Sequence, residues 1–230
     1  MRMIRSNGLI SVIIPVWNGS AYLREAIASV RAQDVGTEII VVDDGSTDGS
    51  REAAAALGCT PVVVPHAGIA KACNIGLRRA TGDYLMMLDQ DDVLCPGSLG
   101  KLLGAFAQDG SLHAAAAKAQ DFISPDLDGE ARDSLLPRAE PYHGLMTGAL
   151  LLQRDAREIV GDFNESFQAG QAVDYLLRIE RSGINYKQLD FVSVMRRLHA
   201  KNTGRTMKDK RFGDYGAILR ARLAGTVNNG

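Results

Sequence analysis

The sequence predicts an α/β fold: a Rossmann-like, mostly parallel sheet flanked by helices. Two observations indicate it. In the first half, short β-branched runs alternate four times with helix-like segments through short connections, which is the pattern of parallel strands joined by crossover helices. Hydrophobic residues make up 46% and charged residues 23% of the 230 residues, so the chain can bury a core. We therefore expect a single domain over residues 1–230.

The predicted elements of the first half follow one another regularly. Strands are expected at 11–15, 38–42, 61–64, 83–88 and 113–119, and helices at 21–33, 49–57, 69–80 and 97–107. Ser20 and Asp48 are expected to cap the first two helices, because their side-chain oxygens can accept hydrogen bonds from free backbone N–H groups.

The second half is less regular. Residues 120–142 contain three prolines and six acidic residues with little periodicity, and we expect a long surface loop there. The remaining expected elements are an apolar run at 144–152, a helix at 171–182, one or two strands at 186–198 and a helix around 211–223.

Polar clusters follow the ends of the predicted strands, and ligands of open α/β sheets bind beyond these carboxyl ends. Two of the clusters contain grouped carboxylates, Asp43-Asp44 and Asp89-Gln90-Asp91-Asp92. Such groups repel one another unless a cation neutralises them, and their oxygen atoms suit Mg²⁺ or Mn²⁺. One interpretation is a metal with a diphosphate on its far side. The other is an acidic loop that caps the helix after Pro96.

Two enzyme classes are disfavoured by missing motifs. The first strand is followed by no Gly-x-Gly-x-x-Gly, and the chain contains no Walker lysine loop, which argues against a dinucleotide oxidoreductase and a P-loop enzyme. The three cysteines are odd in number and far apart, so neither a disulfide framework nor a zinc knuckle is expected.

Several linked segments carry the remaining information. In chain order they are Ser11-Val-Ile-Ile-Pro-Val-Trp-Asn18, Tyr22-Leu-Arg-Glu-Ala-Ile27, Ile40-Val-Val-Asp-Asp-Gly-Ser-Thr-Asp48, Gly82-Asp-Tyr-Leu-Met-Met-Leu-Asp-Gln-Asp-Asp92, Thr147-Gly-Ala-Leu-Leu-Leu-Gln-Arg154, Gly161-Asp-Phe-Asn-Glu-Ser166 and Arg197-Leu-His-Ala-Lys-Asn-Thr203. Together they resemble the family 2 glycosyltransferases, which are inverting, nucleotide-sugar-dependent enzymes with a GT-A fold. The resemblance covers roughly residues 9–205, and linked motifs are far more specific than a single one.

The resemblance implies an activity and a division of the chain. A sugar would move from a nucleotide-diphosphate donor, UDP-linked in the simplest case, to a hydroxyl of a glycan or lipid-linked acceptor, with Mn²⁺ or Mg²⁺ as the cofactor. The donor-binding half would span about 9–119, the acceptor half about 120–198 and a basic tail about 199–230. The alternative is a nucleotide-sugar-binding relative with weak or no transfer activity.

The resemblance also implies a role for individual residues. The backbone of Pro15 and Val16 would contact the nucleotide base, and Asp44 would read it. Asp89 would face the ribose, and Asp91 would bind the metal. The full set of implied nucleotide-sugar contacts is Pro15, Val16, Asn18, Asp43, Asp44, Asn74, Asp89, Gln90 and Asp91. His199 would be a late metal or diphosphate ligand; the plainer interpretation is a surface histidine.

Two positions depart from the family pattern. The family places an acidic pair at the start of a late helix, and its second member is taken as the general base; this chain has Gln171 and Ala172 there. Asp174 is the nearest carboxylate and our candidate catalytic residue, although two residues turn a helical side chain by about 200°. The second departure is Cys73, where an arginine is common.

The charge distribution points to an anionic partner. Residues 196–222 carry nine Lys or Arg and two Asp, or +7, although the whole chain carries −1. We expect this tail to fold over the diphosphate or to contact an anionic membrane surface from the cytoplasmic side. Nucleic acid is not expected as a partner, since Phe212 and Tyr215 alone make no stacking platform. No signal peptide and no membrane span are expected.

Overall fold

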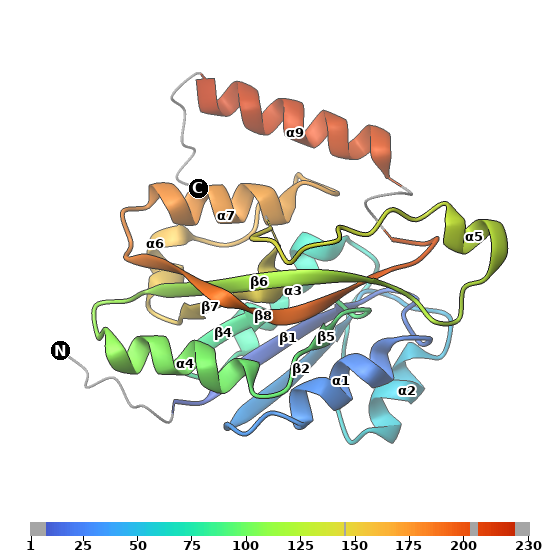
Figure 1. The fold of residues 1–230 in the computed structure, drawn as a ribbon, viewed down its shortest axis with the longest axis horizontal. Helices are drawn as coiled ribbons and strands as arrows, with labels where there is room; N and C mark the ends of the chain where they lie inside the picture. The colour runs from blue at the N-terminus through green and yellow to red at the C-terminus, as the bar shows by residue number, and fades with distance from the viewer. Residues whose placement is uncertain (1–7, 145, 203–206, 224–230) are drawn as a thin grey trace.

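The computed structural model describes residues 8–144, 146–202 and 207–223, and their strands form one eight-stranded sheet in the order β3-β2-β1-β4-β7-β6-β8-β5 (Figure 1). The strands are β1 (Ile10–Val16), β2 (Thr37–Asp43), β3 (Val62–Val63), β4 (Tyr84–Met87), β5 (Val93–Leu94), β6 (Ala114–Ile123), β7 (Leu150–Gln153) and β8 (Tyr186–Leu198). The helices are α1 (Leu23–Arg31), α2 (Ser50–Ala56), α3 (Ile69–Arg79), α4 (Ser98–Gln108), α5 (Gly129–Asp133), the 3₁₀ turn η1 (Thr147–Ala149), α6 (Ala156–Val160), α7 (Gln171–Arg181) and α9 (Lys208–Leu223).

The sheet is mostly parallel, as predicted. β1 pairs in parallel with β2 and β4, and β2 with β3. β7 runs antiparallel to both β4 and β6, and β5 runs antiparallel to β8, whereas β8 is parallel to β6. The carboxyl ends of β1, β2, β4, β6 and β8 therefore lie at one edge of the sheet, and this edge positions the candidate site.

The two faces of the sheet are covered by different helices. Residues alternate along β1: Ile10, Val12 and Ile14 belong to a cluster with residues of α1 and α4, whereas Ile13 packs with residues of α3, α6 and α7. All seven residues of β1 are buried, which explains its unbroken apolar sequence, since a strand covered on both faces has no polar side.

Several local predictions differ from the structure. α1 begins at Leu23 without a side-chain cap; Ser20 is not its cap, because the Ser20 backbone N–H donates to Asp48 Oδ2 at 3.0 Å and holds the preceding turn against the next loop. Asp48 lies before the N-cap residue of α2, Gly49, and accepts from the Ser50 N–H at 3.1 Å.

The predicted loop at 120–142 is shorter than expected, because β6 runs on to Ile123 and α5 interrupts the rest. β5 and α6 were not predicted, since two and five residues carry too little periodicity. β8 has the predicted bounds, and α9 begins three residues before the expected 211. Residues 203–206 and 224–230 of the predicted basic tail lie outside the described residues.

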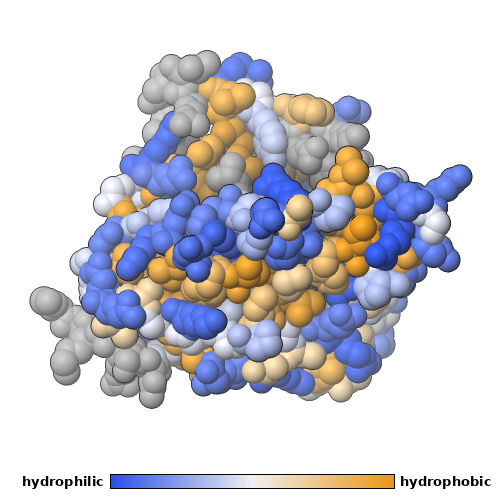
Figure 2. Space-filling view, viewed as in Figure 1, coloured by the Kyte–Doolittle hydropathy of each residue, from blue (hydrophilic) through white to orange (hydrophobic). Residues whose placement is uncertain are grey.

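The outer surface of the second half has two notable features. α9 lies along α7 on the side away from the sheet (Figure 1). Hydrophobic side chains form a band across the middle of this view, bordered by hydrophilic ones (Figure 2). In the part of the chain that the structure describes, no helix combines the length and apolar character needed to cross a bilayer.

Candidate functional site

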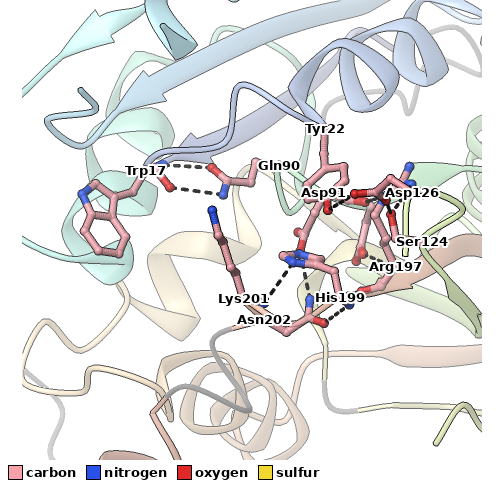
Figure 3. Close-up of polar contacts among 11 residues, drawn as sticks. Trp17, Tyr22, Gln90, Asp91, Ser124, Asp126, Arg197, His199, Lys201 and Asn202 are labelled. Atoms are coloured by element: carbon pink, nitrogen blue, oxygen red, sulfur yellow. Dashed lines mark hydrogen bonds and ion pairs between the residues drawn. The ribbon is translucent and has the colours of Figure 1, made fainter. Parts of the chain in front are cut away.

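An acidic loop, Asp89–Asp92, follows β4 at the carboxyl edge of the sheet. Asp91 Oδ2 lies 2.8 Å from His199 Nε2 and 3.1 Å from Asn202 Nδ2 (Figure 3). His199 directly follows β8, which ends at the same edge. The fold therefore brings together the two residues predicted as metal ligands, and His199 is buried rather than a surface histidine.

The other carboxylates of this loop are electrostatically strained. Asp92 is buried, and desolvation, followed by the charges of Asp91 and Asp89, raises its pKa well above the ordinary value. Asp89 has an exposed face, but the surrounding protein atoms desolvate its carboxylate, and with the charge of Asp91 they raise its pKa to about 6. A cation beside Asp91 would relieve this repulsion.

The donor set at this position fits a divalent metal that a substrate helps to hold. Among the described residues no group of three or more His, Cys, Asp or Glu side chains could hold a metal ion. Asp91 and His199 can supply one carboxylate oxygen and one imidazole nitrogen, both suited to Mn²⁺. The remaining ligands would have to come from water or from a bound anion.

Arg197, on β8, ties the acidic loop to α1 and to the end of β6. Its side chain is 1% exposed. The Nε–H donates to the Asp91 carbonyl at 2.9 Å, NH1 to Ser124 Oγ at 3.2 Å and NH2 to Glu25 Oε2 at 2.6 Å. Its backbone N–H donates to Asp92 Oδ1 at 2.9 Å. The acidic loop is thus anchored by one cation on β8 to α1 and to the end of β6.

Two aromatic rings enclose the Arg197 guanidinium. Its central carbon lies 4.9 Å from the Tyr22 ring centroid and 4.7 Å from that of Phe122. Tyr22 also contacts the His199 ring, with centroids 4.7 Å apart, and its hydroxyl donates to Asp126 at 3.2 Å. The position of His199 therefore depends on the packing around Arg197.

Asp44 follows β2, and both of its carboxylate oxygens accept hydrogen bonds. Its two carboxylate oxygens accept from the backbone N–H groups of Ala67 (2.8 Å) and Gly68 (2.9 Å), and Oδ2 lies 3.0 Å from His66 Nδ1. Its own N–H donates to the Val16 carbonyl at 2.8 Å. These contacts fix Asp44 beside the end of β1, next to the predicted base-contacting residues.

Asp43 and Asn18 build the loop around Asp44. Burial alone would raise the pKa of Asp43, but hydrogen bonds from Ser46 and Arg51 outweigh it and hold this pKa below its ordinary value. Asn18 has a left-handed backbone, with φ of 49°, and its Oδ1 accepts from the Thr47 N–H at 2.9 Å. Both side chains are thus occupied in shaping this loop.

Trp17 presents an exposed aromatic face at the same edge. It is 50% exposed and stacks on His66, with ring centroids 4.7 Å apart and planes at 22°. Gln90 holds its backbone from both sides: the Trp17 N–H donates to Oε1 at 2.9 Å, and Nε2 donates to the Trp17 carbonyl at 3.3 Å (Figure 3). This tryptophan is thus fixed between the acidic loop and Asp44.

Asn74 has a structural set of contacts. Its side chain is buried, accepts from the Phe163 N–H at 2.8 Å, and donates to the Phe163 carbonyl at 3.0 Å and to Glu165 Oε1 at 2.9 Å. It therefore joins α3 to the segment before α7. Its neighbour Cys73 is buried near Asp89, and desolvation followed by that charge raises the pKa of its thiol.

The start of α7 lacks the family's acidic pair. Gln171 is buried, and its Oε1 has no hydrogen-bond partner among the described residues; Ala172 follows it. Asp174 Oδ2 accepts from Arg178 Nε at 2.9 Å, and Arg178 also donates to the carbonyls of Val160 and Asp162. Asp174 is thus engaged in an ion pair that fastens α7 to the segment after α6.

The sequence pattern assigned no individual role to Trp17 or His66. It placed Arg197 in the basic segment expected to cover the diphosphate, but Arg197 lies in β8 and is buried. An aromatic residue directly after a buried strand could have indicated Trp17, whereas the burial of Arg197 depends on partners up to 172 residues away and left no local signal.

The match to the Glycosyl transferase family 2 model covers residues 11–162. The chain belongs to glycosyl transferase family 2. Within this family, chondroitin synthase of Pasteurella multocida is 30% identical over 207 residues, which are 85% of this chain and 21% of that protein. An uncharacterized glycosyltransferase of Haemophilus influenzae is 39% identical over 110 residues, 44% of this chain and 43% of that protein. The chain thus spans less than half the length of these family 2 relatives.

Two solved structures are similar in fold to this chain. The mannosyltransferase PcManGT of Pyrobaculum calidifontis, in complex with GDP-Man and Mn²⁺, has a TM-score of 0.70 at 19% identity, covering 95% of this chain and 65% of the other. S. aureus TarS 1–349 in complex with UDP has a TM-score of 0.66 at 18% identity, covering 82% and 60%. The expected GT-A fold and family resemblance are confirmed.

Proposed function

We propose that this chain transfers a sugar from a UDP-linked donor to a hydroxyl of a glycan or lipid-linked acceptor, as a single catalytic domain. The observation that supports it most is the pairing of Asp91 with His199 at the strand edge that also carries Trp17 and Asp44. A nucleotide with its diphosphate beside Asp91 and its base beside Trp17 would lie along one continuous edge of the sheet. The UDP and UDP-GlcNAc complexes of TarS support a uridine donor.

The base end of the donor site would be formed by the loops after β1 and β2. The Trp17 indole offers a flat apolar face on which a base can stack. The backbone of Pro15 and Val16 ends beside Asp44, whose fixed carboxylate would face the base. Asp43 and Asn18 would act by holding these loops in shape.

The diphosphate end would be formed by the acidic loop and the residues after β8. Asp91 and His199 would hold Mn²⁺ or Mg²⁺, which when bound neutralises charge on the leaving diphosphate. Asp89 would accept hydrogen bonds from the ribose. Lys201 extends toward Gln90 across the gap between the acidic loop and Trp17 (Figure 3), and its ammonium group is placed to pair with a phosphate. The basic tail would thus begin over the diphosphate.

The basic charge after β8 supports a second role for the tail. Lys210 and Arg220 on α9 are exposed, and exposed cations attract anionic lipid headgroups. A lipid-linked acceptor would lie in such a surface, so peripheral contact with the cytoplasmic face of a membrane belongs to this proposal.

A thermal-shift experiment with UDP and GDP, in Mn²⁺ and in EDTA, tests the proposed donor site. Ligand binding to the native state raises the unfolding temperature. We expect UDP with Mn²⁺ to stabilise the chain, EDTA to remove most of the shift, and Asp91→Asn to do the same in the presence of Mn²⁺. Asp128→Asn on the exposed loop before α5 is the matched control. An equal UDP shift in EDTA and in Mn²⁺ would contradict the metal-assisted site.

A further inference from the structure

A carboxylate on α9 lies at the start of α7, where the family's general base is missing. Asp214 Oδ2 accepts hydrogen bonds from three consecutive backbone N–H groups, those of Gln168 (2.9 Å), Ala169 (2.8 Å) and Gly170 (2.9 Å). Gly170 directly precedes Gln171, the first residue of α7. A carboxylate from another helix thus lies at the N-terminal end of α7, two to four residues before Ala172.

The contact between α9 and this loop is close and specific. A Cβ atom on Gly170 would lie 2.7 Å from Asp214 Cβ and 3.2 Å from Ile218 Cδ1, so only glycine allows this approach. Ile218 is 8% exposed, which shows that α9 packs here with an apolar residue as well. The Asp214 carboxylate is therefore held in place by both packing and hydrogen bonds.

The second turn of α7 lies close to the strand that leads into the acidic loop. Tyr175, in the second turn of α7, lines a small cavity together with Met87 at the end of β4 and Thr147, and a Cβ on Gly148 would lie 4.0 Å from Asp92 Oδ2. The second turn of α7 thus packs beside the end of β4, which leads directly into the acidic loop. Chain length adds a second restraint: α9 begins six residues after Asn202, which contacts Asp91, a span of at most about 22 Å.

We propose that Asp214 is the general base of this enzyme, supplied by α9 in place of the residue absent at position 172. The proposal rests on the proposed function. The three N–H donors fix Oδ2, and Oδ1 has no hydrogen-bond partner among the described residues, so Oδ1 accepts the proton of the acceptor hydroxyl. The acceptor oxygen forms the new bond to the sugar C1 as its O–H bond breaks. The bond between C1 and the diphosphate oxygen breaks with its electron pair left on the diphosphate.

Asp174 is the rival carboxylate, and its contacts argue against it. Its Oδ2 is paired with Arg178 Nε at 2.9 Å, and its side chain points about 200° away from that of Ala172 around the helix. The ion pair between this carboxylate and the guanidinium four residues along the helix stabilises the position of α7. Asp174 therefore remains a candidate only if Asp214 fails.

The test measures UDP release from UDP-glucose, UDP-GlcNAc and UDP-glucuronate in Mn²⁺ with water as acceptor, because hydrolysis needs the same deprotonation. The Asp214→Asn side chain keeps an amide oxygen for the three N–H donors but cannot take up the proton. We expect it to lower the rate by about 10²- to 10⁴-fold, to remove the acid limb of the pH–rate profile and to leave UDP affinity unchanged. The unfolding temperature should fall slightly, because three hydrogen bonds to a carboxylate become weaker bonds to a neutral amide. Asp209→Asn, exposed on the same helix, is the matched control and keeps the wild-type rate.

A second variant tests the need for a carboxylate without relying on the contact between α9 and α7. Ala172→Asp in the Asp214→Asn background restores part of the lost rate if a carboxylate at the start of α7 is what the reaction needs. A wild-type rate in Asp214→Asn, or the same loss in Asp174→Asn instead, overturns the proposal and leaves the proposed function standing. Binding of UDP without release from any of the three donors also overturns it. A chain that does not bind UDP at all contradicts the proposed function itself.

Discussion

At the scale of single residues, Trp17 offers the most direct probe of the proposed donor site. It is the one tryptophan of the chain, is half exposed, and stacks on His66 beside Asp44. Base–aromatic stacking is worth about 1–3 kcal/mol, so Trp17→Ala should weaken UDP binding by about 5- to 150-fold. Titration calorimetry with UDP in Mn²⁺ measures the loss.

The control for this residue is Trp17→Phe, which keeps an aromatic face and should retain most of the affinity. In the wild-type chain all tryptophan fluorescence comes from this position, so UDP should change its intensity at the concentration at which calorimetry reports binding. An unchanged UDP affinity in Trp17→Ala would show that the base does not bind at this edge of the sheet.

At the scale of elements, Arg197 couples the end of β8 to the acidic loop. Its guanidinium donates to the Asp91 carbonyl and to Glu25 between two aromatic rings. Arg197→Met keeps the apolar stem but removes the donor to the Asp91 carbonyl and to Ser124 Oγ, and a buried acceptor left unpaired costs about 1–3 kcal/mol before relaxation. We expect a lower unfolding temperature. The factor by which Mn²⁺ strengthens UDP binding should fall at least tenfold, whereas UDP affinity in EDTA should change little.

The neighbouring Arg196→Met serves as the comparison for this prediction. Arg196 pairs with Asp121 at 3.4 Å, and its charge also favours the ionised forms of Asp89 and Asp92, whereas Arg197 donates directly to the Asp91 carbonyl. Loss of Arg196 removes a charge near the loop but no hydrogen bond to Asp91, so the factor by which Mn²⁺ strengthens UDP binding should fall much less than in Arg197→Met. If both variants affect Mn²⁺ dependence equally, Arg197 has no specific effect on Asp91.

Elements also show what the sequence could and could not predict. β1, β2 and β8 were predictable, because a buried strand is an apolar run that local residues define. The ends of β1, β2 and β4 carry Trp17, Asp44 and Asp89, so one edge of the site followed from strand order alone. The Arg197 cluster and the Asp214 contact were not predictable, because their partners lie 172 and 44–46 residues away.

At the scale of the whole molecule, the acidic loop makes stability depend on pH and metal. An unfolded aspartate loses its proton near pH 3.9, but folded Asp89 keeps it to about pH 6, and the pKa of Asp92 is also raised. Since the folded state binds more protons in this interval, stability falls as pH rises from about 4 to about 6. Asp43 acts oppositely, since its lowered pKa contributes stability that is lost on acidification below about pH 4.

Asp89→Asn isolates the contribution of the acidic loop, because Asp43 is the same in both proteins. The neutral amide removes one like charge beside Asp91, so the variant should unfold at a higher temperature than the wild type at pH 7 and at nearly the same temperature at pH 4. Calorimetric scans at both pH values without metal measure this difference. Mn²⁺ should narrow the gap at pH 7, because it stabilises the wild type by neutralising the repulsion that the variant lacks. An identical offset at both pH values would show that Asp89 affects stability by packing rather than by charge.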